Sequence, residues 1–372
     1  MKKSFVKSGI IIACVLVGVV AVTAIMFKRT AAVHNYEEEV QTQQLLSRHW
    51  DESELKERFE NFINAIKNKE GIEDFIVPDI KEEEKETIRK YFKAFEGKSD
   101  IAYVYTKMPI LHKVSGTDEY NDLRGLMELK FRVTEEGNKV TEYTVMLKMA
   151  RLGDASSIKW KTYGILYSDK GVDVSDVDLY QLDMPKTGEE VCIMTTDAGV
   201  IKMRLFPDKA PMAVKNWIEL SKQDFYNGRD FYRVIKGFVI QSGSIDGMSD
   251  ENTTVYNSLF ENEVNGELHN FNGALCLANG GPHTSGNQFY IVQCSEIRNE
   301  EALPQLSLPE NVKLKYKEVG GIPELDGRYT VFGQVYEGLD IVEKIASQET
   351  NADDAPLNNP VKIQKIEFQK YE

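Results

Sequence analysis

The feature that most constrains this chain is an uncharged apolar run near its N-terminus. Residues 9–27 read GIIIACVLVGVVAVTAIMF, which is 19 residues without a charged side chain. As a helix, this run would be close to the roughly 20 residues that cross a bilayer core. Three lysines precede it and a Lys-Arg pair follows it. We therefore expect residues 1–30 to be an N-terminal transmembrane anchor, and the remainder of the chain to fold in water.

The flanking charges also predict which side of the membrane the body occupies. Lysines ahead of an apolar run favour a cytoplasmic N-terminus, which places the rest of the chain outside the cytoplasm. A cleaved signal peptide usually has a shorter apolar region of about 7–15 residues. We therefore predict an uncleaved single-pass anchor in the cell membrane. The alternative is secretion after cleavage, for which Ala32 offers the best position.

Charge and cysteine content exclude several functional classes. Five of the 45 basic residues lie in the first 30, where there is no acid, so the remainder has 40 basic and 59 acidic residues and a net charge of −19. Such an acidic body disfavours nucleic acid as a partner, because phosphate contacts need clustered Lys and Arg. Beyond the apolar run, Cys192, Cys276 and Cys294 are odd in number and lack CxxC spacing. We expect no disulfide framework, metal site or cofactor, and interpret Cys192 and Cys276 as core residues.

Residues 34–180 change their hydrophobic period from helical to extended. Two stretches carry apolar residues at i, i+3, i+4 and i+7 spacing, and a later stretch alternates apolar and charged residues. Helices followed by antiparallel strands predict an α+β domain, whose role the sequence leaves open. The two helical faces and the alternating strand consist of Leu55, Phe59, Phe62, Ile63 and Ile66, then Ile88, Tyr91, Phe92 and Phe95, then Met127, Leu129, Phe131 and Val133.

The region 186–372 begins with strand-like runs and then carries three separated motif blocks. Residues 190–195 and 200–205 flank a short turn, and a helix is predicted after Pro211. The blocks read FYRVIKGFVIQSG (231–243), LANGGPHTSGNQFYIVQ (277–293) and ELDGRYTVFGQVYEGLDIVEKI (324–345). The Gly-rich block lacks the Gly-Lys-Ser/Thr ending of a phosphate loop and is not predicted to lead into a helix.

These blocks, in this order, resemble the cyclophilins from about Glu189 to the end of the chain. The resemblance implies a mainly β fold, a closed eight-stranded antiparallel barrel capped by two helices, the second near residues 338–347. It also implies peptidyl-prolyl cis/trans isomerase activity of a bacterial-like type, assisting the folding of exported proteins. The expected partners are proline-containing polypeptide clients.

The chemistry that the resemblance implies needs no covalent step. The peptide C–N bond has a rotation barrier of about 18–20 kcal/mol, and a catalyst must favour the twisted amide over both planar forms. By resemblance, Arg233 is the catalytic guanidinium and Gln241 orients it, whereas spacing alone would describe Arg233 as a solvated strand arginine. Phe289 would point to the barrel core. The implied substrate-binding residues are Phe238, Val239, Ala278, Asn279, Gln288, Tyr290, Leu325 and Tyr329.

Several positions depart from the usual family pattern. Val239 replaces Met, Tyr290 replaces Phe and adds a hydroxyl that needs a partner, and Glu324 stands where cyclosporin-sensitive members have Trp. Residues 295–323 form an insertion beside the pocket, which either shapes client choice or is a solvated excursion. We predict catalysis without tight cyclosporin binding. The alternative is a catalytically weak peptide-binding module or holdase chaperone.

Overall fold

The computed structural model describes residues 44–45, 52–96, 98, 100–113, 123–154, 157–244 and 253–372. The chain divides into two compact units. One comprises Val177–Leu306 and Asn311–Glu372, and the other ends at Asp176 and includes Ser307–Glu310. The apolar run of residues 9–27, predicted to be an anchor, lies outside the described residues. Among the helices of the described part, none has the length and apolar character to span a membrane.

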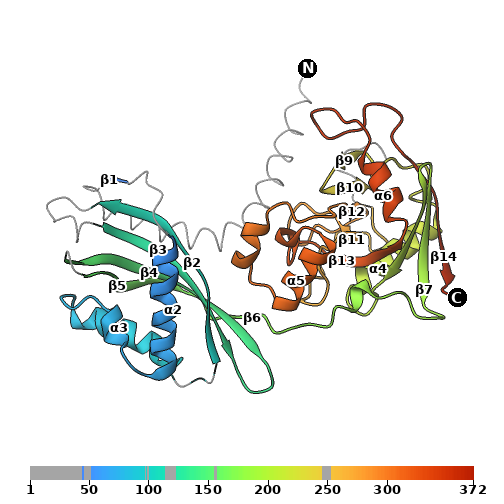
Figure 1. Ribbon diagram of the computed structural model, residues 1–372. Coiled ribbons are helices and arrows are strands. Elements are labelled where there is room, and N and C mark those ends of the chain that lie inside the picture. The colour runs from blue at the N-terminus through green and yellow to red at the C-terminus, as the bar shows by residue number, and fades with distance from the viewer. Residues whose placement is uncertain are drawn as a thin grey trace. The chain divides into compact units, whose positions relative to one another are not determined.

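The unit that ends at Asp176 is an α+β unit, as the change of hydrophobic period predicts (Figure 1). Its antiparallel sheet has the order β1-β2-β3-β4-β5, with β6 also paired to β4. The two predicted helical faces and the alternating strand meet in one buried cluster, in which Phe62 contacts Phe75 and Phe92. The elements are α2 (Glu52–Asn68), η1 (Ile72–Phe75), α3 (Glu82–Lys93), β1 (Gln44–Leu45), β2 (Asp100–Lys113), β3 (Leu123–Thr134), β4 (Val140–Asp154), β5 (Ser157–Ser168) and β6 (Val172–Asp173).

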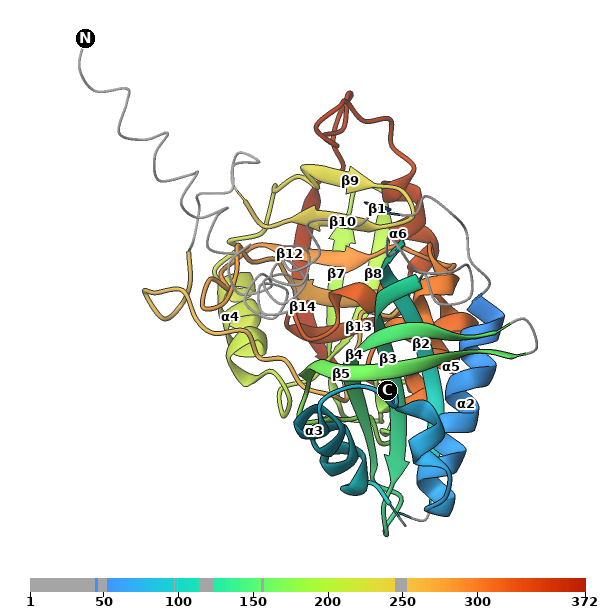
Figure 2. The ribbon, with the colours of Figure 1, turned by 90° about the vertical axis from the view of Figure 1, so that its left-hand side faces the viewer.

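The unit that begins at Val177 contains one eight-stranded antiparallel sheet, in the order β14-β7-β8-β13-β11-β12-β10-β9. Figure 2 shows β9, β10 and β12 side by side at one end of this order. The strands are β7 (Glu190–Thr196), β8 (Gly199–Leu205), β9 (Arg233–Ile235), β10 (Val239–Ser242), β11 (Ala274–Leu277), β12 (Phe289–Val292), β13 (Val331–Glu337) and β14 (Ile363–Lys370).

The prediction of a closed barrel is wrong in one respect: the sheet does not close. The two end strands, β9 and β14, form no ladder with each other in the described residues, and the sheet is open and curled. A single antiparallel bridge, between Asp230 and Lys362, lies just before each of these strands. The physical reason is that the chain meets the start of β14 before β9 begins at Arg233, through backbone hydrogen bonds such as that from the Phe231 amide to the Val361 carbonyl at 3.0 Å. The predicted strand count and antiparallel pairing are confirmed.

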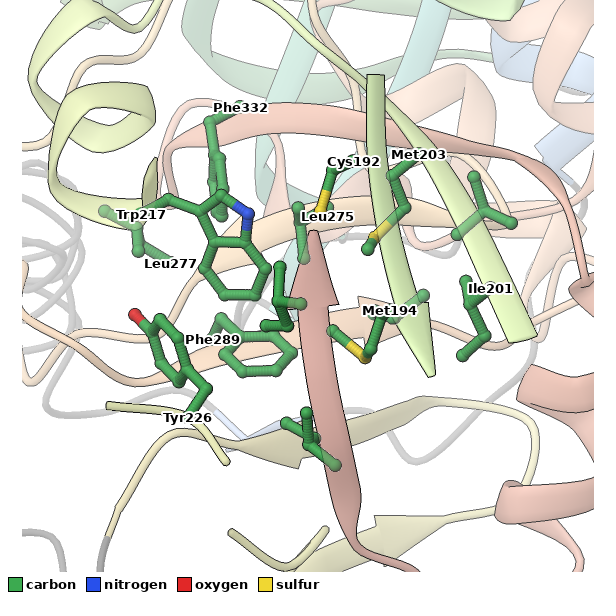
Figure 3. Close-up of a cluster of buried hydrophobic side chains, with 14 of the residues drawn as sticks. Cys192, Met194, Ile201, Met203, Trp217, Tyr226, Leu275, Leu277, Phe289 and Phe332 are labelled. Atoms are coloured by element: carbon green, nitrogen blue, oxygen red, sulfur yellow. The ribbon is translucent and has the colours of Figure 1, made fainter. Parts of the chain in front are cut away.

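Two helices cover the face of this sheet that carries the main core, as predicted. Helix α4 (Pro211–Lys222) and helix α6 (Leu339–Ala346) bury Trp217 and Ile345 in the same core cluster. Figure 3 shows Trp217 and Tyr226 against Phe289, and the rings of Trp217 and Phe289 meet edge to face at 4.8 Å. The remaining helices are η2 (Tyr180–Leu182), η3 (Glu300–Gln305), α5 (Glu310–Val319) and η4 (Pro323–Leu325).

Candidate active site

The hairpin of β9 and β10 brings the first two predicted site residues together. Arg233 on β9 pairs directly across from Gln241 on β10, and Gln241 pairs in turn with Tyr290 on β12. The Arg233 Nη1 donates a long hydrogen bond of 3.4 Å to Gln241 Oε1. Because the Arg233 side chain is 38% exposed, its guanidinium is fixed from one side and open to solvent from another.

Asp354, which the sequence analysis missed, also contacts Arg233. Its Oδ2 lies 3.5 Å from Arg233 Nε, and its backbone carbonyl accepts a 2.8 Å hydrogen bond from the Val234 amide. Both partners of the ion pair are partly exposed, so the pair contributes at most about 1 kcal/mol. It guides the guanidinium without removing it from solvent. No sequence pattern connects the loop between α6 and β14 with β9.

Tyr232 is a second residue that the sequence analysis missed. Gln241 Nε2 donates to the Tyr232 hydroxyl at 2.6 Å, and that hydroxyl donates to Gln288 Oε1 at 2.5 Å. Burial raises the pKa of Tyr232 to about 12, against the opposing effects of the Gln241 hydrogen bond and the Arg233 charge. The hydroxyl therefore keeps its proton at neutral pH. It fixes the amide of Gln241 with its oxygen toward Arg233.

The predicted pocket residues form one apolar cluster on the opposite face of the sheet from the main core. Val239 and Tyr290 are buried within it, and the rings of Tyr290 and Tyr329 meet edge to face at 5.7 Å. Phe289, one residue before Tyr290, lies in the main core, as the alternation of a strand requires. Its predicted core position is confirmed. The partly buried members of the cluster include Phe238, Ala278, Leu325 and Tyr329.

The segment between β11 and β12 holds the remaining predicted residues. The Ala278 amide donates to the Gln288 carbonyl at 2.9 Å, so these two residues fix each other's backbone. The Asn279 side chain accepts from the Gly281 amide at 3.1 Å and donates to the Arg328 carbonyl at 3.3 Å. The Asn279 side chain thus organises its own loop.

The added hydroxyl of Tyr290 has the partner that its burial requires. It donates to Asn270 Oδ1 at 2.8 Å, and burial raises the pKa of Tyr290 well above its usual range. The side chain of Tyr290 is therefore a neutral donor with a single fixed orientation. Asn270 lies outside the motif blocks that drew attention to the site, which explains why the sequence analysis missed it.

The three cysteines beyond the apolar run are free and buried. Cys192 is a buried member of the main core and Cys276 of the pocket cluster, which confirms their interpretation as core residues. Burial raises the pKa of both thiols, so neither is a reactive thiolate at neutral pH. Within the described ranges, no three His, Cys, Asp or Glu side chains gather as a metal site would need.

Comparison with known proteins places this unit in a family. Residues 191–368 match the model for cyclophilin type peptidyl-prolyl cis-trans isomerase/CLD. A putative peptidyl-prolyl cis-trans isomerase of Staphylococcus saprophyticus is 42% identical over 194 residues, which cover 50% of this chain and 96% of that protein. A putative bifunctional phosphatase/peptidyl-prolyl cis-trans isomerase of Streptococcus pyogenes is 40% identical over 210 residues, or 55% of this chain and 44% of that protein.

A solved cyclophilin type peptidyl-prolyl cis-trans isomerase of Cryptosporidium parvum is 24% identical, with a TM-score of 0.41, and covers 49% of this chain and 99% of its own. Half of this chain matches the staphylococcal protein over almost the whole of that protein's length. Through that unit, the chain belongs to the cyclophilin-type peptidyl-prolyl cis-trans isomerases and is an enzyme of that class.

Proposed function

We propose that Arg233 catalyses rotation about X-Pro peptide bonds of polypeptide clients by stabilising the twisted amide. The observation that carries this proposal is the position of Arg233, beside Gln241 and next to the apolar cluster built around Val239 and Tyr290. A guanidinium and an apolar wall lie at adjacent places on one sheet, and each suits one part of a prolyl residue. The ring needs an apolar surface, and its nitrogen needs a donor when the amide twists.

The chemistry follows from the electronic structure of the amide. Rotation out of plane breaks the resonance that makes up the barrier of about 18–20 kcal/mol, and it leaves a lone pair on the prolyl nitrogen. A donor aimed at that lone pair interacts with the twisted form more strongly than with either planar form, and only such differential binding lowers the barrier. A single preorganised donor of this kind is worth about 10²–10³ in rate.

The test compares isomerisation of a short Ala-Pro peptide by four full-chain proteins: wild type, Arg233→Ala, Arg233→Lys and the control Lys236→Ala. Lys236 is exposed on the turn of the same hairpin. We expect Arg233→Ala to lower kcat/KM by about 10²–10³. Arg233→Lys should recover little, because an ammonium lacks the planar fork of donors. Wild type and Arg233→Ala both at the uncatalysed rate would sink the proposal.

We further propose that the clients are exported proteins and that the enzyme acts from the membrane. The support is the 19-residue uncharged run with lysines before it, which is near the length of a bilayer span. With the N-terminus in the cytoplasm, the isomerase unit would meet chains as they emerge on the far side.

A peptide-binding module or holdase is the second candidate. It is favoured by the altered wall at Val239 and Tyr290 and by the exposed ion pair between Arg233 and Asp354, which competes for the guanidinium. The same four proteins distinguish the two functions. A binding module would hold the peptide with equal affinity in wild type and Arg233→Ala, and neither protein would accelerate isomerisation.

A further inference from the structure

A buried carboxylate lies behind the proline-pocket cluster and is not used in the mechanism above. The Asp326 side chain is 8% exposed, and its two oxygens face four donors. Oδ1 accepts from the Asn270 amide at 2.8 Å, from Asn270 Nδ2 at 2.9 Å and from the Tyr316 hydroxyl at 2.8 Å. Oδ2 lies 2.8 Å from His269 Nδ1. Since a carboxylate only accepts, that ring nitrogen is the donor.

This network reaches the pocket wall through Asn270. The Asn270 amide group donates to Asp326 through its nitrogen, which leaves its oxygen to accept from the Tyr290 hydroxyl at 2.8 Å. The chain of contacts therefore runs from Tyr316 through Asp326 and Asn270 to Tyr290. Asp326 also follows Leu325 directly in a short turn, and both Leu325 and Tyr290 belong to the pocket cluster. One carboxylate thus holds two parts of the wall.

Tyr316 belongs to α5, inside the insertion at 295–323, and it is fully buried. Its ring packs against Phe271 at 4.5 Å. The chain then returns to the pocket at Gly321, whose φ is +131° and where a Cβ would lie 2.7 Å from the Tyr316 ring. The next amide, of Ile322, donates to the Asn270 carbonyl at 2.9 Å. The insertion is therefore a packed element, and its interpretation as a solvated excursion is wrong.

We propose that Tyr316 is a positioning residue of the proline pocket, by which the α5 insertion sets the wall formed by Tyr290 and Leu325. The inference rests on the proposed function, since it concerns the same pocket. Its physical basis is that a buried carboxylate holds the groups around it while its donors are in place, and that the loss of one donor loosens them. Removal of the Tyr316 hydroxyl deprives Asp326 of one donor. The carboxylate, Asn270 and the wall then gain alternative positions.

The test measures affinity and isomerisation for an Ala-Pro peptide with the full chain carrying Tyr316→Phe. We expect Kd and KM to rise about threefold to tenfold, the range for the net contribution of one ordinary hydrogen bond. We expect kcat to stay within about twofold, because a looser wall weakens binding of the planar and twisted forms alike. In a Tyr290→Phe background, which cuts the network at the wall, the effect of Tyr316→Phe should be smaller.

Tyr256→Phe is the matched control. The Tyr256 hydroxyl donates to the Met212 carbonyl at 3.0 Å in the same unit, away from the Asp326 network. This control should lose a tyrosine hydrogen bond to a neutral carbonyl, at a partly buried position, without any change in peptide affinity. An additional measurement needs no variant: the Asn270 amide proton of the wild type should exchange more slowly when peptide saturates the pocket, because coupling between two sites is reciprocal.

Two results would overturn the inference: wild-type affinity in a folded Tyr316→Phe protein, or Asn270 exchange that peptide leaves unchanged. Failure of the proposed function would give a different result, because the wild type itself would then not accelerate isomerisation. Affinity and exchange are read without catalysis, so they decide the role of Tyr316 in either case. Should Tyr316→Phe melt below the assay temperature, the exchange measurement on the wild type decides alone.

Discussion

At the scale of single residues, the orientation of one amide determines whether Arg233 has an acceptor beside it. Gln241 presents its oxygen to Arg233 while its nitrogen is held by the Tyr232 hydroxyl at 2.6 Å and, at a longer 3.4 Å, by Gln288 Oε1. An amide without that hydroxyl can turn its NH₂ group toward the guanidinium, which it would repel. We therefore propose that Tyr232 acts on catalysis through Gln241. Its hydroxyl stays protonated throughout an ordinary assay, because burial raises its pKa to about 12.

We predict that Tyr232→Phe lowers kcat for an Ala-Pro peptide about threefold to tenfold, the scale of one buried hydrogen bond. KM should change less than kcat, since the apolar wall is untouched and only Gln288 among the implied substrate-binding residues loses a hydrogen bond. Tyr232→His should restore the rate above about pH 6.5, where a neutral imidazole both donates and accepts, and lose it below, where imidazolium only donates. Steady-state rates from pH 5.5 to 8.5 measure this. A change in KM alone, or a His variant without pH dependence, would contradict the prediction.

The residues of the site were predictable to the extent that they lie in the motif blocks. Arg233, Gln241 and Tyr290 are neighbours across three strands, as the resemblance implied. Asp354 and Asn270 were not predictable, because each reaches the site from a loop far away in sequence and no spacing rule connects them with it. Hydrogen-bond partners of this kind depend on how loops pack over a sheet, which hydrophobic periodicity does not encode.

At the scale of elements, one carboxylate joins three parts of the α+β unit. Asp74 in η1 contacts Arg58 of α2 at 3.1 Å, and Lys159 and Lys161 of β5 at 3.1 and 3.5 Å. Partial burial acts to raise the pKa of Asp74, but hydrogen bonds from Lys159 and Arg58 outweigh it and lower the pKa to about 2. The folded pKa is thus below the unfolded value of about 3.9. The resulting stability is present above pH 4 and is lost as the pH falls toward 2.

We predict that Asp74→Asn lowers the free energy of unfolding by no more than about 1 kcal/mol at pH 7, because the carboxylate is 44% exposed and screened by solvent. The difference from wild type should shrink between pH 4 and pH 2. Urea unfolding followed by circular dichroism measures both. Asp79→Asn, at an exposed acid in the following turn, is the matched control and should show no such pH dependence. A penalty that persists at pH 2 would disprove the assignment.

The helices and strands themselves were largely predictable, whereas the open form of the eight-stranded sheet was not. The amphipathic helices and alternating strands appear where the apolar periods change, because burial of one face is what those periods encode. Helix α6 at Leu339–Ala346 also confirms the second cap. The length of β9 was not encoded in this way. Three residues suffice to place Arg233, but they are too few to extend a ladder toward β14.

At the scale of the whole molecule, the family match does not extend into the first half of the chain. Apart from Ser307–Glu310, the matched residues, 191–368, lie within the unit that begins at Val177, and the staphylococcal relative is covered to 96% of its length by 50% of this chain. All of the candidate site residues lie in the unit that begins at Val177. We propose that the rest of the chain bears on where the enzyme acts and on which clients. Placement is the part of that question on which the sequence makes a definite prediction.

We predict that the full chain sediments with membranes and stays there through extraction at high pH, because 19 uncharged residues are about the length of a bilayer span. The double variant Leu16→Lys/Val20→Lys should no longer sediment with membranes, since each lysine near the centre of the run raises the free energy of membrane insertion by about 2.5–3.5 kcal/mol. Val172→Lys with Met184→Lys, at two exposed apolar positions of the folded body, is the control and should sediment like wild type. Protein found in the medium with an N-terminus just after Ala32 would instead establish secretion after cleavage. Full-length protein in the soluble fraction would exclude both the membrane anchor and the cleaved signal.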